Sequence, residues 1–239
     1  MGQWGQKDHV NNYLEIADVF VVGRRDSLDI LKSFYRQFYL ERPNPVRLLD
    51  LGCGDGILTR QLLTVDPSLT ATLLDGSEDM IDKARQFLPD DGRFTFVCST
   101  FEQIIEGQTS LPDCDLAVSS LAIHHLSLDQ KKRLFKLIFD HLLPEGYFLN
   151  IDAVRSPSEA IEQWYLKLWM EGVYAADPSE EVKSIFEGMV EAYVQPDHYA
   201  RIDTLEDQMR IMREVGFRQV ECFYKRGLFT LYGGKRFSS

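Results

Sequence analysis

The stretch that decides the fold reads Val46-Arg47-Leu48-Leu49-Asp50-Leu51-Gly52-Cys53-Gly54-Asp55-Gly56, and residues 57–65 follow it. The apolar run before the glycines is typical of a buried parallel strand, which carries apolar side chains on both faces. Closely spaced glycines allow a tight turn whose backbone can approach a ligand. Residues 57–65 then show the periodicity of an amphipathic helix. Together these features predict an α/β domain with a nucleoside-cofactor site at the turn.

The spacing of the glycines argues against two common phosphate-binding motifs. The dinucleotide fingerprint needs a third glycine three residues after the second, where helix and strand pack closely, and Ile57 holds that place here. No Gly-Lys-Ser/Thr follows, so the P-loop pattern is absent as well. Asp50 and Asp55 flank the turn and would repel a pyrophosphate. A nicotinamide dehydrogenase is therefore disfavoured, and a cationic cofactor without phosphate, such as S-adenosylmethionine, fits better.

The segment Asp50-Leu-Gly-Cys-Gly-Asp-Gly56 resembles the Asp/Glu-x-Gly-x-Gly-x-Gly motif of class I S-adenosylmethionine-dependent methyltransferases. Later segments resemble that family's next strands in the same order, at 71–75, 94–101, 115–126 and 143–152. The resemblance implies an α/β fold with a Rossmann-like, doubly wound, seven-stranded sheet that ends in an antiparallel C-terminal hairpin. Residues 217–224 and 228–235 read as the two strands of that hairpin.

The resemblance also implies which residues bind S-adenosylmethionine. Asp75 ends the second strand, where the ribose hydroxyls need an acceptor, and Ser77 is already available to cap the next helix. Thr100 and Phe101 border the adenine, and Tyr13 reaches the methionine end. The cofactor-binding candidates are Tyr13, Asp50, Gly52, Gly54, Asp75, Gly76, Met80, Thr100, Phe101 and Ser119.

Catalysis by such a protein needs few groups, because the sulfonium is already activated and the enzyme mainly aligns an acceptor and excludes water. A general base is required only if the acceptor starts protonated. His124 and His125 follow the fourth strand and Asp152 ends the fifth, so these three are the catalytic candidates. A structural role for the histidine pair in its loop is an alternative. Asp152 could equally orient the acceptor or cap the insert that follows.

The chain divides into four segments. These are an N-terminal helical cap (1–45), a cofactor-binding α/β core (46–154), a helical lid insert (155–203), and a C-terminal helix with a β-hairpin (204–239). Capping boxes at Ser127/Gln130 and Asp203/Glu206 each predict the start of a helix, and residues 143–146 are expected to end the first of these helices.

The insert is unusually aromatic and carries two apolar stripes at helical spacing. We expect the second helix to begin at Asp177-Pro178. The stripes either pack on each other as an αα lid or line an apolar acceptor pocket, and they could also form a homodimer interface. The first stripe is Ile161, Trp164, Tyr165, Leu168 and Trp169, and the second is Val182, Ile185, Phe186, Met189 and Tyr193.

The composition limits which nucleic acids, membranes and metals we expect the protein to bind. A formal net charge of −11 provides no basic footprint for duplex nucleic acid or an anionic membrane surface. Residues 1–7 lack the apolar core of a signal peptide, and no run is long enough to span a membrane, so a cytoplasmic protein is expected. The four cysteines are far apart and form no Cys-x-x-Cys pair, so no metal site is expected.

The favoured function is transfer of a methyl group to a small-molecule acceptor by in-line displacement. One alternative is an enzyme like carboxy-S-adenosylmethionine synthase of tRNA modification, to which the whole chain is loosely similar. That function needs an arginine for the added carboxylate, and Arg24, Arg25 and Arg201 are available. The other alternative, a non-catalytic S-adenosylmethionine-binding subunit, would be expected to carry a damaged glycine motif, whereas the motif here is intact.

Overall fold

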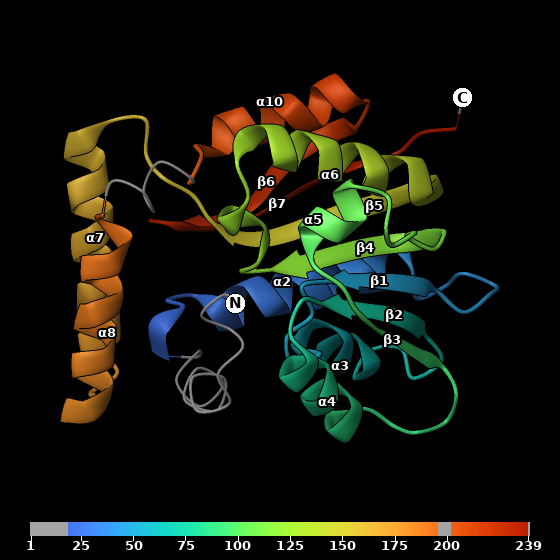
Figure 1. The fold of residues 1–239 in the computed structure, drawn as a ribbon, viewed down its shortest axis with the longest axis horizontal. Helices are drawn as coiled ribbons and strands as arrows, with labels where there is room; N and C mark the ends of the chain where they lie inside the picture. The colour runs from blue at the N-terminus through green and yellow to red at the C-terminus, as the bar shows by residue number, and fades with distance from the viewer. Residues whose placement is uncertain (1–18, 196–201, 239) are drawn as a thin grey trace.

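A computed structural model describes residues 19–195 and 202–238, which form one sheet with helices on both faces. Seven strands run in the order β3-β2-β1-β4-β5-β7-β6 (Figure 1). The first five are parallel, and β7 is antiparallel to both β5 and β6. The predicted sheet with an antiparallel terminal hairpin is therefore confirmed. The strands are β1 (Arg47–Leu51), β2 (Thr70–Asp75), β3 (Phe94–Cys98), β4 (Cys114–Ser120), β5 (Leu142–Ala153), β6 (Arg218–Arg226) and β7 (Phe229–Lys235).

The helices form one layer on each face of the sheet (Figure 1). Successive side chains of a strand point to opposite faces, so β1 places Leu48 in one apolar cluster and Leu49 in the other. Both faces are thereby covered, as a parallel sheet requires. One layer holds α2 (Arg24–Phe38), α3 (Ile57–Leu63) and α4 (Glu78–Phe87), and the other holds α5 (Phe101–Ile105), α6 (Leu128–His141) and α10 (Leu205–Val215).

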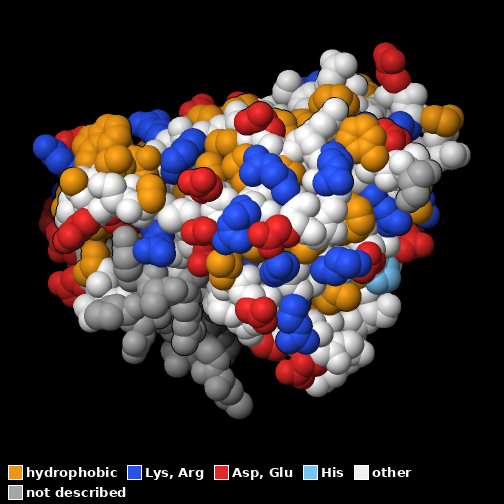
Figure 2. Space-filling model, turned by 90° about the horizontal axis from the view of Figure 1, so that it is seen from above, with side chains coloured by type: hydrophobic (Ala, Val, Ile, Leu, Met, Phe, Trp, Pro, Cys, Tyr) orange, Lys and Arg blue, Asp and Glu red, His pale blue; other side chains and the backbone are white. Residues whose placement is uncertain are grey.

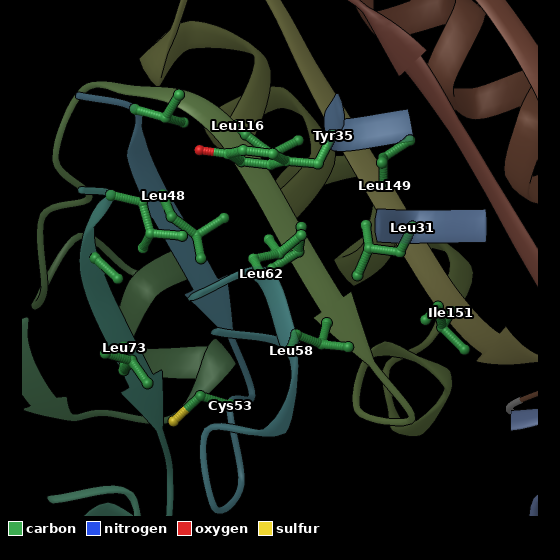
Figure 3. Packing of buried hydrophobic residues seen from close by; sticks show 14 of the residues in the cluster. Leu31, Tyr35, Leu48, Cys53, Leu58, Leu62, Leu73, Leu116, Leu149 and Ile151 are labelled. Atoms are coloured by element: carbon green, nitrogen blue, oxygen red, sulfur yellow. The ribbon is translucent and has the colours of Figure 1, made fainter. Parts of the chain in front are cut away.

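The described part of the N-terminal segment belongs to the first layer. Figure 3 shows Leu31 and Tyr35 of α2 over the central strands, beside Leu149 of β5. The Tyr35 side chain is fully buried, and its hydroxyl donates to Asp66 Oδ2 at 2.6 Å. Helix α2 therefore packs on the sheet and contributes to the main core.

The boundary between α6 and the fifth strand lies where the sequence predicted it. Helix α6 begins after the Ser127/Gln130 capping box and ends at His141. Residues 143–146, which were expected to end the helix and open the fifth strand, lie in the first part of β5. The strand is irregular there, because its register with β4 shifts and Glu145 has a φ of 66°. The third strand is shorter than predicted and ends at Cys98.

The predicted cap of the C-terminal helix is shifted by one residue. Thr204, not Asp203, is the N-cap of α10, and its hydroxyl accepts a hydrogen bond from the Asp207 N–H at 3.1 Å. The Asp203 carboxylate instead accepts from Lys131 Nζ at 2.5 Å, and that lysine side chain is fully buried. A buried ammonium is costly without an opposite charge, which explains why Asp203 is turned away from the helix end.

The insert forms two antiparallel helices, α7 (Glu159–Tyr174) and α8 (Glu180–Tyr193), at the carboxyl ends of the parallel strands (Figure 1). They pack on each other, with the Trp169 and Phe186 rings edge to face at 5.0 Å. The second predicted stripe is confirmed, since Phe186 and Tyr193 are buried and its other members pack beside them. Helix α8 starts after Ser179, two residues later than predicted.

The first stripe was wrong in part, since Trp169 is buried as predicted but Ile161 and Trp164 are not. Ile161 and Trp164 are 42% and 55% exposed, and the buried row of α7 is instead Glu162, Leu166, Trp169 and Val173. The reason is that Glu162 is a buried member of the row. Its Oε1 accepts from the Tyr193 hydroxyl at 2.7 Å, and its Oε2 accepts from the Ser156 N–H. A buried acid that is satisfied by hydrogen bonds does not appear in an apolar pattern.

The surface over α6 and α10 mixes both signs of charge. Figure 2 shows basic and acidic side chains interspersed across this face. Some of them join the two helices, since Lys132 pairs with Glu214 at 2.7 Å and Glu214 also meets Arg210 at 2.8 Å. This face therefore offers no continuous basic stripe.

Candidate functional site

The β1–α3 turn and the loop after β4 meet at the carboxyl end of the sheet. β1 pairs with β2 on one side and with β4 on the other, so the strand order reverses at this point. Open α/β sheets bind ligands at such a reversal. The two connections touch, because a Cβ added to Gly52 would overlap the Cβ of Ala122. Leu121, just before Ala122, has a φ of 52°, which is strained for a residue with a branched side chain.

The glycines of the turn are required by the backbone. Gly52, Gly54 and Gly56 have φ values of +64°, +56° and +77°, in the left-handed region. Gly52 is enclosed by Ala122 and the Phe101 ring. Gly54 differs, since among the described residues other than its chain neighbours no atom lies within 4 Å of a Cβ added there. The described residues therefore leave space beside the Gly54 backbone, and its role in binding a ligand stays a prediction.

Asp75 joins the end of β2 to the glycine turn. Its Oδ2 accepts from the Gly54 N–H and its Oδ1 accepts from the Ser77 N–H, both at 2.9 Å. Ser77 caps α4, as predicted. Burial raises the pKa of Asp75, and the backbone N–H groups of Gly54, Ser77 and Gly76 oppose that rise. Because a carboxylate oxygen can accept more than one hydrogen bond, Asp75 can still bind hydroxyl groups.

Asp50 is a fully enclosed carboxyl group beneath the turn. Its Oδ2 accepts from the Thr59 hydroxyl at 2.7 Å and from the Thr59 N–H at 3.3 Å. Its Oδ1 has no hydrogen-bond partner among the described residues. Burial raises the pKa of Asp50 to about 7 against the Thr59 hydrogen bonds, with a smaller contribution from the carboxylates of Asp55 and Asp75. Two neighbouring carboxyl groups with raised pKa values make this end of the sheet suitable for a cation.

Three other predicted cofactor residues lie beside the turn. Phe101 is the first residue of α5, and its ring is against Gly52. Thr100 caps α5, and its hydroxyl accepts from the Gln103 N–H at 3.3 Å. Gly76 is next to Thr100, since a Cβ added to Gly76 would be 3.3 Å from Thr100 Cγ2. The structure thus brings Gly52, Asp75, Gly76, Thr100 and Phe101 together.

Two predicted residues are buried in the framework, and one cannot be placed. Met80 is buried in the first turn of α4. Ser119 is fully buried, and its hydroxyl donates to the Leu51 carbonyl at 2.7 Å, which ties β4 to β1. Their binding roles stay predictions. Tyr13 lies outside the described residues.

The structure brings His124 and Asp152 together. His124 belongs to the short 3-10 helix η2 (Ile123–His125), and its Nδ1 is 2.6 Å from Asp152 Oδ1. The Asp152 side chain is fully buried, whereas that of His124 is 14% exposed. Burial alone would raise the pKa of Asp152, but the charge and hydrogen bond of His124, the charge of Lys131 and the Ala153 N–H bring it below the ordinary value. An ionised carboxylate only accepts, so the neutral imidazole tautomer that fits this contact carries its hydrogen on Nδ1 and has none on Nε2.

The second histidine candidate and the arginines considered for an added carboxylate are not part of the His124–Asp152 pair. His125 is exposed, and its ring centroid is 4.1 Å from that of His124. Arg24 and Arg25 begin α2, with Arg24 half-buried and Arg25 exposed. Arg201 lies outside the described residues.

Sequence reasoning missed two polar residues behind the His124–Asp152 pair. Asn150 and Tyr232 are fully buried and lie opposite each other on β5 and β7. The Asn150 Nδ2 donates to the Tyr232 hydroxyl at 2.8 Å and to Asp152 Oδ2 at 3.3 Å. The available signal was a lone amide inside the apolar run from Tyr147 to Ile151.

Neither a metal centre nor a membrane span is present in the part of the chain that the structure describes. Within it, no three or more His, Cys, Asp or Glu side chains are grouped so that they could hold a metal ion. No described helix has both the length and the apolar character needed to cross a bilayer.

Comparison with known proteins agrees with this geometry. A family model described as a methyltransferase domain matches residues 49–148. A carboxy-S-adenosyl-L-methionine synthase of Trichodesmium erythraeum (strain IMS101) is 23% identical over 78% of this chain and 71% of that protein. A malonyl-(acyl-carrier protein) O-methyltransferase of Bacillus cytotoxicus is 35% identical over 44% of this chain and 34% of that protein.

Solved structures share the fold. Human N-acetylserotonin methyltransferase in complex with SAM superposes with a TM-score of 0.62 at 14% identity. The match covers 98% of this chain but 57% of that one, so this chain spans little more than half of that protein.

Proposed function

We propose that this chain, which belongs to the class I S-adenosylmethionine-dependent methyltransferases, transfers a methyl group to a small-molecule acceptor whose nucleophile starts protonated. Its cofactor is S-adenosylmethionine, which supplies an activated methyl group when bound. The observation that carries the proposal is the 2.6 Å contact between His124 Nδ1 and the buried Asp152 carboxylate. Transfer takes place by in-line displacement.

The residues of the turn fit the cofactor. The open space at Gly54 lets the backbone approach the methionine portion, and Asp75 accepts from the ribose hydroxyls. The unpartnered Oδ1 of Asp50 suits a cationic group, because an opposite charge favours the ionised carboxylate. Gly76, Thr100 and Phe101 border the adenine.

Replacing Asp75 by alanine is expected to weaken binding of S-adenosylmethionine about 100-fold, since hydrogen bonds to a charged group contribute roughly 1.5–3 kcal/mol. Calorimetric titration of wild-type and variant protein measures this. The matched control is Asp82→Ala in α4, the helix that follows Asp75. The Asp82 side chain is 57% exposed and pairs with Arg85. A 2′-deoxy analogue separates ribose binding from disturbance of the turn, because it should lose affinity for the wild type but not for Asp75→Ala. Equal binding by wild type and Asp75→Ala would contradict the assignment.

Binding of S-adenosylmethionine near pH 7 is expected to release about half a proton from Asp50, whose pKa is about 7 in the free protein. A bound cation lowers that pKa, so affinity should rise as the pH rises towards 7 and level off above it. Calorimetry in buffers of different ionisation enthalpy measures the release.

Two comparisons test the origin of this proton. Asp50→Asn should abolish the release. 5′-Methylthioadenosine, a neutral nucleoside without the sulfonium and the ammonium, should release much less than S-adenosylmethionine does. Proton release that persists in Asp50→Asn would assign it to another group.

His124 acts as the general base at Nε2, because Nδ1–H is donated to Asp152. As the acceptor attacks, its proton passes to Nε2, and the ionised Asp152 stabilises the resulting imidazolium without taking the proton. Asp152 is fully buried, so it acts through His124 and does not touch the acceptor. The lid of α7 and α8 helps to exclude water from the carboxyl end of the sheet.

A second candidate function is synthesis of a carboxylated form of S-adenosylmethionine. It is favoured by the relative from Trichodesmium erythraeum, whose match extends over 78% of this chain. Mass spectrometry of the ligand released from freshly purified protein separates the two functions. S-adenosylmethionine or S-adenosylhomocysteine supports methyl transfer, and a carboxylated cofactor supports the synthase.

A further inference from the structure

A continuous line of hydrogen-bonded side chains runs from α10 through the sheet to His124. It begins at Gln208 of α10, whose Oε1 accepts from the Tyr232 hydroxyl of β7. The Tyr232 oxygen in turn accepts from Asn150 Nδ2 at 2.8 Å, and the same amide donates to Asp152 Oδ2 at 3.3 Å. Asp152 Oδ1 then meets His124 Nδ1 at 2.6 Å.

Four members of this line are fully buried: Gln208, Tyr232, Asn150 and Asp152 are each 0% exposed. Polar side chains in such a place are costly unless they are paired, and an apolar set of the same volume would serve packing equally well. Yet Asn150 Oδ1 and Gln208 Nε2 find no hydrogen-bond partner among the described residues, so the network is incompletely satisfied. Packing alone therefore gives no reason for these side chains.

Each hydrogen bond of the line has a defined donor, and Asn150 donates in both directions along it. The Tyr232 proton points to Gln208, which leaves the phenol oxygen as the acceptor for Asn150. Asn150 thereby presents its other N–H to Asp152, so this carboxylate is held as an acceptor on both oxygens. An acceptor-only carboxylate fixes the hydrogen of His124 on Nδ1.

We propose that Tyr232, with Asn150, is a positioning residue that holds Asp152 and thereby keeps the His124 imidazole in the Nδ1–H tautomer with Nε2 free to accept a proton. This inference rests on the proposed function of His124 as the base. Neither Tyr232 nor Asn150 touches the acceptor, because both are buried behind Asp152. Gln208 orients the Tyr232 hydroxyl from the far end.

Other charged groups surround the pair and are left in place by a change at Tyr232. Lys131 of α6 lies near Asp152 and pairs with Asp203 at 2.5 Å, and the His125 ring contacts the His124 ring at a tilt. Because these groups are not in the line, removing the Tyr232 hydroxyl isolates its contribution. Without that hydroxyl, Asn150 has one buried N–H unpaired and turns its amide away from Asp152.

The test is Tyr232→Phe, which removes one oxygen atom and keeps the ring. In ¹⁵N-detected spectra of the histidine rings, assigned by the loss of a signal in His124→Gln, the wild type should show His124 as the Nδ1–H tautomer. Tyr232→Phe should show a mixture of tautomers. The low-pH limb of the methyl-transfer rate profile should move to lower pH by about half a unit, because a less firmly held Asp152 stabilises the imidazolium less. The kcat should fall about tenfold, with S-adenosylmethionine affinity unchanged.

The matched control is Tyr35→Phe. Tyr35 is likewise 0% exposed and donates its hydroxyl to a carboxylate, Asp66, but on the other face of the sheet. It should leave the His124 spectrum and the pH profile unchanged. If Tyr232→Phe fails to fold, Gln208→Met probes the same line from its far end and should give a smaller shift in the same direction.

The outcomes separate the two proposals, because the spectra need neither acceptor nor turnover. If Tyr232→Phe matches Tyr35→Phe in tautomer and pH profile, the positioning role is overturned. If the tautomer changes while His124→Gln keeps full methyl-transfer activity, the line is real and the base assignment fails instead.

Discussion

Replacing His124 by glutamine is expected to lower kcat by a factor on the order of 10²–10⁴ with hydroxyl or amine acceptors, and to leave the affinity for S-adenosylmethionine unchanged. The reason is that glutamine cannot take the acceptor's proton, whereas the residues of the glycine turn are untouched. Release of S-adenosylhomocysteine, measured at saturating cofactor and across pH, gives kcat. An acceptor that is already ionised should lose much less, because it needs no base.

Two other histidines serve as controls for this result. His141, at the end of α6, also faces a carboxylate, with Nδ1 3.3 Å from Asp113 Oδ1, but that pair is exposed. His141→Gln should therefore leave kcat unchanged. His125→Gln separates the two neighbouring candidates, since a large loss there with none at His124 would transfer the role of base to His125. Full activity in both variants would mean that the acceptor requires no base.

Replacing Gly52 by alanine is expected to lower the free energy of unfolding by about 2–4 kcal/mol. Two costs add: the φ of +64° is unfavourable for a residue with a Cβ, and that Cβ would overlap Ala122 of the neighbouring loop. To relieve the overlap, the loop that carries η2 must move away from the turn. Denaturant unfolding at equilibrium measures the loss.

Substitutions at Gly54 and Gly92 separate the cost of the positive φ from the cost of the overlap. Gly54→Ala has a similar φ of +56° but no overlap, so it should cost about 1 kcal/mol in stability. It should nevertheless weaken S-adenosylmethionine binding at least tenfold, because the methyl group would occupy the space that the backbone leaves for the ligand. Gly92→Ala, with a φ of +79° and open surroundings before β3, should cost the same stability and leave binding intact. Tight binding by Gly54→Ala would place the cofactor elsewhere.

The parts of the fold that local chemistry determines were predictable. Apolar runs that end at glycines or acids located the parallel strands, because a strand buried on both faces has few other solutions. Ser127 and Gln130 located the start of α6 through a capping box that needs only four residues. The glycines predicted the backbone conformation of the turn, since the positive φ values at Gly52 and Gly54 disfavour most other residues.

Features that depend on distant residues were not predictable. Asp203 and Thr204 are both good caps, and the Asp203 carboxylate is instead used by the buried Lys131, 72 positions away. The row on α7 was misjudged because Glu162 is satisfied by Tyr193 of the next helix.

The candidate site also has a part that the sequence predicts and a part that depends on distant residues. His124 and Asp152 could each be named from their strand ends, yet their 2.6 Å contact requires the parallel pairing of β4 with β5. The role inferred for Tyr232 further requires the antiparallel register that sets it opposite Asn150.

The two ends of the lid lie side by side, since Arg155 and Thr204 form an isolated parallel bridge and the Arg155 N–H donates to the Asp203 carbonyl at 3.2 Å. Helices α7 and α8 thus form an excursion that leaves and rejoins the core at one place. A protein engineer could exchange that excursion for one of another length and leave the nucleoside-binding half intact, because longer loops add little to the entropy of closure. In the proposed methyl transfer, the same arrangement would let the acceptor site change while the cofactor site is kept.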